Sequence, residues 1–279
     1  MGRRPLRNSM IFETAYAKIN LALHVRRRRA DGYHDLESLF AFACDGDELS
    51  AELSDRITLQ IDGRFGEGLS AGDDNLVMRA AHSMRTEFGV KQGAALSLDK
   101  KLPIASGIGG GSADAAATLR LLARLWGIDP HHPTLLEIAR SLGADVPACL
   151  NSVTVWGEGR GDELCDIEIE EITGTSLLLI NPLIPLATGP VFAGWDQIDR
   201  GLLVPQQYAS ARNDLTASAT AIVPQISKIL ATLAVQPGIV LARMSGSGAT
   251  CFGMFESRDT RDAAAVQFRD IWCLATRLR

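Results

Sequence analysis

Residues 102–117 read LPIASGIGGGSADAAA, a glycine-rich run that leads directly into an expected helix over residues 113–126. Four glycines fall within five residues, namely Gly107, Gly109, Gly110 and Gly111. Glycines let backbone N–H groups approach a ligand with no side chain in the way. Because a helix N-terminus adds a partial positive charge, the stretch predicts a phosphate-binding loop. Ser112 is expected to cap the helix or to offer its hydroxyl to a phosphate or a metal.

The better-known phosphate loops and catalytic motifs do not match this stretch. A Walker A loop requires a Gly-Lys pair, which is absent, and a dinucleotide-binding fingerprint requires Gly or Ala where Ser112 stands. Protein-kinase motifs and the G-x-S-x-G element of serine hydrolases are also absent, although the chain contains a Gly-Ser-Gly at residues 246–248. Two interpretations remain: a different kind of phosphate loop, or a flexible loop without a ligand.

Composition limits the class of protein. The 279 residues are 46% hydrophobic, which is enough for two modest cores. The formal net charge of -5 disfavours nucleic acid as a partner, and the absence of an apolar run of about 18 residues disfavours a membrane span. The five cysteines are scattered and form no C-x-x-C pair, and the basic N-terminus has no apolar stretch behind it. Both observations indicate a cytoplasmic protein.

The order of expected elements indicates an α+β protein of two domains. Strict alternation over residues 17–25 predicts a half-buried strand, and an exposed turn is expected at residues 26–32. Further expected strands cover residues 36–44, 56–61, 94–98, 152–156, 176–181, 239–244 and 250–255, and expected helices cover residues 75–88, 134–142 and 221–233. Strands and helices do not alternate regularly, so the domains are predicted over residues 1–155 and 156–279, with residues 1–9 as a frayed extension.

Polar residues elsewhere are candidates for chemistry. Lys18 and Asn20 share the face opposite the apolar residues of their strand, about 6–7 Å apart, so they face either solvent or a cleft. Asp145 follows a helix stop at Gly143, and Pro147 is expected to keep Val146 out of helical geometry. Taken singly, a solvated lysine and a turn-forming carboxylate are the simpler interpretations.

Taken together, five segments resemble the GHMP kinases: AKINLALHV (17–25), ADGYHDLES (30–38), the glycine loop (102–117), LGADVP (142–147) and MSGSGATCF (244–252). Within that superfamily, A-K-I-N-L, R-x-D-G-Y-H and G-A-D-V-P resemble the branch of the diphosphocytidyl-methylerythritol kinases. The resemblance covers about residues 16–255, and the combination is far more specific than any one segment.

The resemblance implies a fold and a reaction. It implies an N-terminal domain like the second domain of ribosomal protein S5, a C-terminal ferredoxin-like domain, and a cleft between them for ATP and a small-molecule substrate. The implied reaction transfers the γ-phosphoryl group of ATP to the 2-hydroxyl of 4-diphosphocytidyl-2-C-methyl-D-erythritol in the non-mevalonate isoprenoid pathway. Mg2+ is implied as a cofactor that rides on the nucleotide phosphates without a dedicated set of protein ligands. A monomer or weak homodimer is expected.

The resemblance also implies roles for residues. Asp145 matches the catalytic aspartate, expected to act as general base, and Lys18 matches the catalytic lysine, expected to stabilise charge. Expected substrate-binding residues are Asn20, Tyr33, His34, Thr188, Phe192, Asn213 and Asp214. Expected ATP-binding residues are Asn75, Lys100, Pro103, Ser106, Gly107, Ile108, Gly109, Gly110, Gly111 and Ser112.

The sequence departs from the family pattern at one place and leaves two alternatives open. The family loop often begins with three glycines, whereas this chain has Ala105-Ser106-Gly107. One alternative is another GHMP enzyme, such as a homoserine or mevalonate-pathway kinase, and D-G-Y-H with Phe192 downstream argues against it. The other is a nucleotide-binding protein without activity, against which the retention of both Lys18 and Asp145 argues.

Overall fold

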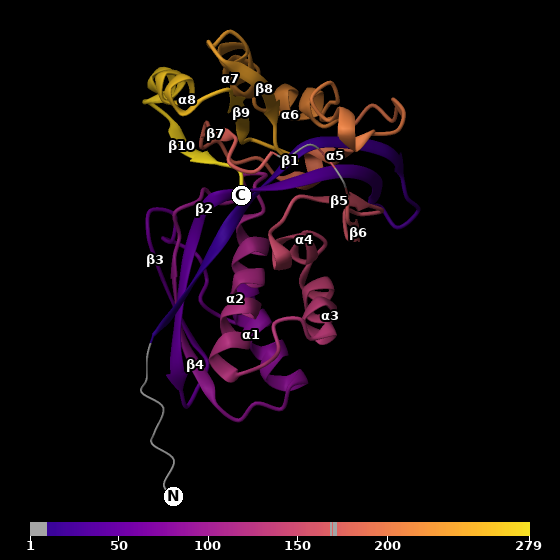
Figure 1. Cartoon of the computed structure of the whole chain (residues 1–279). Helices are drawn as coiled ribbons and strands as arrows, with labels where there is room; N and C mark the ends of the chain where they lie inside the picture. Colours follow the sequence, from indigo (N-terminus) through magenta and orange to yellow (C-terminus); the bar gives the residue numbers. More distant parts are fainter. Residues whose placement is uncertain (1–9, 168, 170–171) are drawn as a thin grey trace, which may run out of the picture.

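The computed structural model describes residues 10–167, 169 and 172–279. The predicted extension over residues 1–9 lies outside the described residues. Two α+β parts stack along the long axis of the molecule, and the long strands β1 (Ile11–Arg28) and β2 (His34–Ser54) run from the lower part up to the upper part (Figure 1). The prediction of a two-domain α+β protein is confirmed.

The first part is a mixed sheet covered by helices. Its strand order is β3-β4-β2-β5-β6, with β1 paired to β2, and only β3 and β4 run parallel. The remaining strands of this sheet are β3 (Thr58–Asp62), β4 (Gly93–Asp99), β5 (Val155–Glu158) and β6 (Glu163–Cys165). The helices are α1 (Leu76–Glu87), α2 (Gly110–Trp126), α3 (Pro133–Leu142) and α4 (Val146–Asn151).

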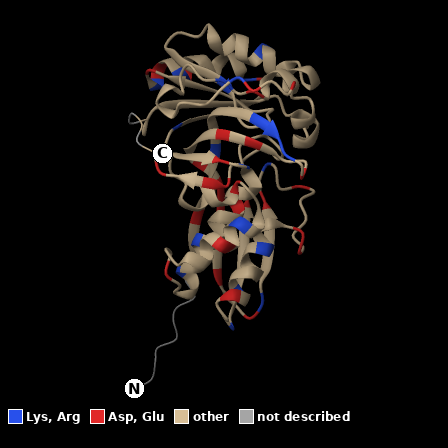
Figure 2. Cartoon of the chain, turned by 90° about the vertical axis from the view of Figure 1, so that its right-hand side faces the viewer, with Lys and Arg blue, Asp and Glu red and all other residues tan. Residues whose placement is uncertain are grey.

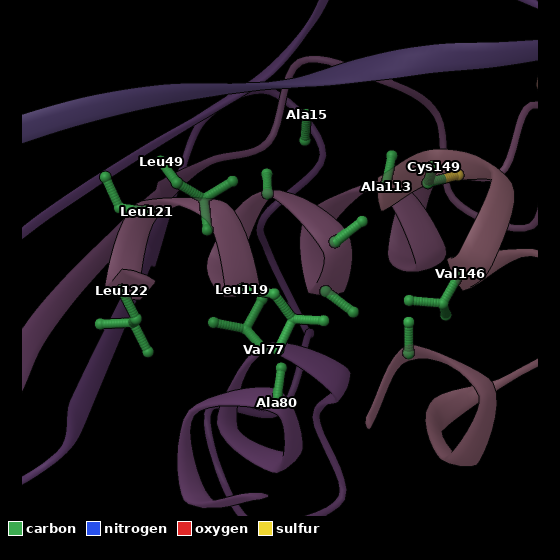
Figure 3. Packing of buried hydrophobic residues seen from close by; sticks show 14 of the residues in the cluster. Ala15, Leu49, Val77, Ala80, Ala113, Leu119, Leu121, Leu122, Val146 and Cys149 are labelled. Atoms are coloured by element: carbon green, nitrogen blue, oxygen red, sulfur yellow. The ribbon is translucent and has the colours of Figure 1, made fainter. Parts of the chain in front are cut away.

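Helix α2 is the centre of the first core. Small residues on it allow α1, α4 and the sheet to approach closely, so ten of its residues are buried. Figure 3 shows Leu119 of α2 packed against Val77 and Ala80 of α1, with Leu121 and Leu49 on the side of the sheet. This packing fixes the direction in which the N-terminus of α2, and therefore the glycine loop, points.

The second part is an antiparallel sheet of order β10-β7-β9-β8. Its strands are β7 (Ser176–Asn181), β8 (Ile239–Met244), β9 (Cys251–Phe255) and β10 (Trp272–Arg277). The helices are α5 (Thr188–Ala193), α6 (Thr216–Ile222), α7 (Gln225–Ala234) and α8 (Arg258–Ala265), with 3-10 turns at Pro205–Gln207 and Val266–Phe268. Helices lie between β7 and β8 and between β9 and β10, which is the ferredoxin-like arrangement that the resemblance implied.

Strand β1 is buried on both faces, so the prediction of a half-buried strand is wrong. Its apolar residues, among them Ile19 and Leu21, pack against the second sheet, in one cluster with Leu179 of β7 and Phe252 of β9. The opposite face of β1 is not solvated either, because Lys18 is only 3% exposed. Sequence alternation could not show this, because the cover comes from segments far away in the chain.

Other local predictions need correction. The exposed turn is shorter than residues 26–32, because β1 continues to Arg28. Ser112 does not cap α2, since the N-cap position belongs to Gly109 in the left-handed region at φ 68°. Val146 is helical in spite of Pro147, which occupies the first turn of α4, where proline is tolerated because no N–H is needed.

The predicted helix over residues 221–233 is also wrong as a single element. The chain forms α6 and α7 instead, and they meet at Val223 and Pro224. Proline disfavours helical geometry in the residue before it, so the break follows from the sequence.

The boundary between the parts remains a prediction. Strand β5 spans the predicted division at 155/156 and pairs with β2, and β6 extends the first sheet to Cys165. We propose that the boundary lies between Cys165 and Ser176, where the second sheet begins. The C-terminal Arg279 returns to the first sheet, where its backbone N–H donates to the carbonyl of Phe42.

Candidate active site

A cavity of about 780 Å³ opens between the two parts. It is lined by every predicted site residue except Ile108, Asn213 and Asp214. The first part contributes the glycine loop and β1, and the second part contributes α5 and the turn over residues 245–248. The cavity therefore brings together segments that are more than 200 residues apart in the sequence.

The glycine loop is locked against β1 and against the turn of the second part. The backbone N–H of Lys18 donates to the carbonyl of Ile108 at 3.0 Å, and the Ser245 hydroxyl donates to the carbonyl of Gly107 at 2.8 Å. Gly107 has φ 75°, and a Cβ there would lie 2.5 Å from the carbonyl oxygen of Ser245. Only glycine fits this contact, so three separate motifs interlock at one point.

Lys18 and Asp145 form an ion pair inside the cavity. The Lys18 Nζ lies 2.7 Å from an Asp145 carboxylate oxygen. The lysine side chain is 4% exposed, whereas the aspartate side chain is 41% exposed. Asp145 stands at the N-cap position of α4, but its side chain makes no capping hydrogen bond. The carboxylate is held by a buried ammonium and remains open to a ligand.

The surroundings of Lys18 hold it in place. Its ammonium lies 4.7 Å from the centre of the Phe40 ring, which is a cation–π contact. A Cβ on Gly109 would lie 3.1 Å from the Lys18 Cβ, so the glycine loop passes directly over the lysine stem. This places the catalytic-lysine candidate beneath the loop expected to hold phosphates.

Asn20 has one hydrogen-bonding group occupied and one free. Its amide nitrogen donates to the Ser38 hydroxyl at 2.7 Å, and that hydroxyl donates to the carbonyl of Ala22 at 2.8 Å. The Asn20 side-chain oxygen is buried and has no partner among the described residues. Because a buried acceptor without a partner is costly, this oxygen is suited to accept a hydrogen bond from a bound ligand.

Lys100 is part of a buried charge cluster behind the glycine loop. Its Nζ lies 2.5 Å from Asp47 and 2.6 Å from Asp114, and all three residues are buried. Burial raises the pKa of the Asp114 carboxyl to about 7, although Lys100 acts in the opposite direction. Asp47 also accepts two backbone hydrogen bonds, from Lys101 and Leu102. The cluster ties β2, the start of the loop and the first turn of α2 together.

Aromatic rings gather at the other end of the cavity. The rings of His34 and Phe192 lie 5.0 Å apart, and the Trp195 ring meets His34 edge-on at 5.8 Å. Burial and the positive charge of Arg28 lower the pKa of His34, so its imidazole is neutral at neutral pH and carries one donor and one acceptor. Tyr33 is exposed on the same rim, 5.3 Å beneath the guanidinium of Arg160.

Several predicted binding residues have structural partners of their own. The hydroxyls of Thr188 and Ser247 lie 3.0 Å apart on the cavity wall. The Asn213 amide donates to the carbonyls of Met244 and Gly246, and the Asp214 carboxylate accepts from the backbone of Val25. Neither Asn213 nor Asp214 lines the cavity, so they support the wall from behind.

Three of the expected ATP-binding residues also have local structural roles. Asn75 caps α1, and its side-chain oxygen accepts from the backbone N–H of Val77 at 2.9 Å. The Ser106 hydroxyl donates to the carbonyl of Pro103 at 2.6 Å, which shapes the start of the loop. Ile108 is fully buried behind the loop.

Sequence reasoning missed functional neighbours that the fold brings in. Asp47, Asp114, Ser38, Ser245 and Ser247 were not among the predicted residues. Asp114 lies only two residues beyond Ser112, and a buried carboxylate on an alanine-rich helix face is a signal that could have been noticed.

The described residues offer no preformed metal centre, because no group of three or more His, Cys, Asp or Glu side chains among them is arranged to hold an ion. The carboxylates that line the cavity are Asp114 and Asp145, and each is paired with a lysine. This fits Mg2+, which binds mainly through substrate phosphates and needs few protein ligands. None of the described helices is both long and apolar enough to cross a bilayer.

Comparison with known proteins identifies the family. The family model "GHMP kinases N terminal domain" matches residues 75–152, and "GHMP kinases C terminal" matches residues 197–272. A protein of Rhizorhabdus wittichii named 4-diphosphocytidyl-2-C-methyl-D-erythritol kinase is 54% identical over 277 residues, covering 96% of this chain and 94% of that protein. The chain belongs to the GHMP kinases, in the branch of the 4-diphosphocytidyl-2-C-methyl-D-erythritol kinases. A second kinase of that name, from Sphingopyxis alaskensis, is 50% identical and covers 96% of this chain and 98% of its own.

Solved structures of GHMP kinases share the fold. A crystal structure of 4-(cytidine 5'-diphospho)-2C-methyl-D-erythritol kinase matches with a TM-score of 0.83 and 30% identity, covering 96% of this chain and 99% of that one. A homoserine kinase from Cytophaga hutchinsonii matches with a TM-score of 0.72 and 17% identity, covering 99% and 98%. The second likeness shows the fold alone. GHMP kinases use ATP as co-substrate, which accords with the glycine loop of this kinase.

Proposed function

We propose that this kinase transfers the γ-phosphoryl group of ATP to the 2-hydroxyl of 4-diphosphocytidyl-2-C-methyl-D-erythritol, giving the 2-phosphate and ADP in the non-mevalonate isoprenoid pathway. The observation that carries the proposal is the Lys18–Asp145 pair at 2.7 Å, in a cavity that has a glycine loop at one end and the packed rings of His34 and Phe192, 5.0 Å apart and tilted by 38°, at the other. Two relatives that are 54% and 50% identical over nearly the whole chain are named as kinases of this acceptor, which supports the choice of acceptor.

The glycine loop is the proposed phosphate site. Backbone N–H groups at the start of α2 point toward a bound anion, and the helix dipole favours negative charge there. Lys100 lies close behind the loop, since a Cβ on Gly110 would be 3.2 Å from its Nζ. Mg2+ on the nucleotide phosphates would supply neutralisation of their charge.

Asp145 is the proposed general base. Its carboxylate is open to the cavity and can accept the proton of the acceptor hydroxyl as the oxygen attacks phosphorus. Lys18 is proposed to orient this carboxylate and to stabilise the negative charge that develops on the transferred group. The free oxygen of Asn20 is proposed to accept a hydrogen bond from a hydroxyl of the acceptor, which would orient it for in-line attack.

The aromatic end is the proposed cytosine pocket. Base–aromatic stacking is worth roughly 1–3 kcal/mol and does not distinguish bases strongly. A neutral His34 can donate its N–H to N3 of cytosine, whereas uracil carries a hydrogen at N3 and would meet donor with donor. Phe192 and Tyr33 are proposed to supply the stacking surfaces, Phe192 from α5 and Tyr33 from the loop before β2.

A coupled ADP-release assay over a panel of alcohols tests the proposal. The panel contains the cytidine-diphosphate-linked methylerythritol, homoserine and mevalonate, with a reaction lacking any acceptor as the control for ATP hydrolysis. We expect turnover with the cytidine-linked acceptor alone. Turnover with homoserine or mevalonate instead would replace the proposal by the corresponding GHMP kinase activity, and turnover with none would support a binding protein without activity.

A further inference from the structure

The four arginines at the end of β1 have different surroundings. Three of them are neutralised by carboxylates: Arg26 by Glu37 and Asp199 at 3.6 and 3.0 Å, Arg27 by Asp35 at 2.5 Å, and Arg29 by Asp31 and Asp35 at 3.1 and 3.0 Å. Within the described part of the chain, Arg28 has no carboxylate in ion-pair contact. Figure 2 shows this basic end of β1 as a blue arrowhead between the upper and lower parts. The run is therefore not a uniform solvated turn, because three of its arginines are paired with carboxylates and Arg28 has no such partner among the described residues.

Arg28 is also the arginine of this run that faces the cavity. It lines the cavity wall, and it pairs with His34 across the β1–β2 ladder. Residues directly opposite in an antiparallel pair project to the same side of the sheet. The Arg28 side chain therefore lies beside the imidazole that packs against Phe192, at the end of the cavity where the acceptor's base is proposed to bind.

Among the cationic side chains that line the cavity, Arg28 is the one without an ion-pair partner in the part of the chain that the structure describes. Four cationic side chains line it: Lys18, Lys100, Arg28 and Arg160. Asp145 pairs with Lys18, Asp47 and Asp114 pair with Lys100, and Asp162 pairs with Arg160 at 2.5 Å. The positive charge of Arg28 acts on the neighbouring His34, because it is the second cause, after burial, of the lowered pKa of that histidine. A cationic wall position without a counter-charge is a site for an anionic group of the ligand.

We propose that Arg28 binds the diphosphate of the cytidine-linked acceptor, between the base at His34 and the reacting hydroxyl at Asp145. This inference rests on the proposed function and adds a subsite to it. A guanidinium presents N–H donors in a fork that matches two phosphate oxygens at once, which a lysine cannot reproduce. The contact would hold the acceptor in the register that brings its hydroxyl to the base.

Binding of CDP and of cytidine isolates the contact, because the two ligands share the base and differ in the diphosphate. Calorimetry is run on the wild type and on Arg28→Gln, with Arg27→Gln as the matched control. The control removes the same charge at the neighbouring position. The Arg27 side chain is 77% exposed and already paired with Asp35, so its loss should not affect the ligand. We expect Arg28→Gln to weaken CDP binding roughly tenfold or more, in line with loss of a charged hydrogen bond. The dissociation constant of cytidine should differ by no more than about twofold between Arg28→Gln and the wild type.

Steady-state kinetics provide a second readout. With Arg28→Gln the KM for the cytidine-linked acceptor should rise roughly tenfold while the KM for ATP stays unchanged, because the arginine contacts a part of the acceptor that does not react. Arg28→Lys, which keeps the charge but not the fork, should fall between the wild type and the glutamine variant. Arg27→Gln should match the wild type in every measurement.

Each contrary outcome has a distinct meaning. If the wild type binds CDP more tightly than cytidine and Arg28→Gln leaves that difference intact, the subsite is wrong and the proposed function stands. Equal weakening of CDP binding and cytidine binding would mean that Arg28 supports the base pocket. A raised KM for ATP would mean that its charge acts on the nucleotide phosphates. Either result overturns the subsite. A wild type that binds neither CDP nor cytidine overturns the proposed function together with the subsite.

Discussion

Gly107 lies where the glycine loop meets β1 and the second part of the molecule, and replacing it by alanine should disrupt both contacts of the loop. Its φ of 75° is a conformation that residues with a side chain rarely adopt. An added Cβ would lie 2.5 Å from the Ser245 carbonyl oxygen and 2.6 Å from that of Gly248. Both neighbours are backbone atoms, so they cannot move aside as the end of a flexible side chain could.

The expected magnitude follows from these two effects. The left-handed conformation costs a residue with a Cβ about 1–2 kcal/mol. Overpacking against atoms that must shift costs about 1–3 kcal/mol more. In the free protein the loop can relax away from Ser245, but the proposed ATP site requires the native loop, so we expect this strain to weaken ATP binding. Even the lower end, about 2 kcal/mol, corresponds to a roughly 30-fold rise in Kd.

Calorimetric titration with a non-hydrolysable ATP analogue measures the effect, and thermal melts show whether the fold survives. Gly111→Ala is the matched control in the same loop, because its Cβ would meet only the Leu76 side chain, at an ordinary 3.6 Å. We expect a lower melting temperature and at least the stated loss of affinity for Gly107→Ala, and a melting temperature near that of the wild type for Gly111→Ala. A Gly107→Ala protein with wild-type Kd and melting temperature would refute the interlocking of the three motifs.

Two further predictions concern the cytosine pocket and the buried charges. Phe192→Ala should lower kcat/KM for cytidine- and uridine-linked acceptors alike, by the roughly 1–3 kcal/mol of a lost stacking contact. His34→Ala should instead reduce the difference in kcat/KM between the two acceptors. Equal kcat/KM for both acceptors in the wild type would contradict the cytosine pocket. The folded-state pKa of Asp114, about 7, is raised above its ordinary 3.8, so its contribution to stability is full below about pH 4 and is lost as pH rises through 7. Asp114→Asn should therefore flatten the fall in melting temperature between pH 5 and pH 8, and an unchanged slope would show that this carboxyl does not titrate there.

Much of the fold follows from local sequence, because local rules set it. Asn75 and Phe88 flank α1 at the ends of the predicted helix, and β8 and β9 lie at the predicted strands over residues 239–244 and 250–255. The glycine loop was predicted because its composition has few uses other than close approach to an anion. These features depend on contacts within a few residues, which a single sequence contains.

The rest depends on contacts between distant segments. Nothing local to Lys18 shows that the second part of the molecule covers its strand, and the lysine alone resembles a solvated one. The Lys100 cluster joins Asp47 and Asp114, which are 53 and 14 residues away, so sequence spacing does not reveal it. Likewise, the four arginines after residue 25 look alike in the sequence, and only the structure separates Arg28 from its neighbours.

The central claim is that Asp145, held by Lys18, removes the proton of the acceptor hydroxyl during phosphoryl transfer. The most direct measurement is the single-turnover rate of phosphorylation of the cytidine-linked methylerythritol by the wild type and by Asp145→Asn, with nucleotide affinity measured on the same preparations. We expect a rate at least about a hundredfold lower for Asp145→Asn, the low end for loss of a general base, with ATP affinity nearly unchanged. A folded Asp145→Asn kinase that turns over at close to the wild-type rate would contradict it.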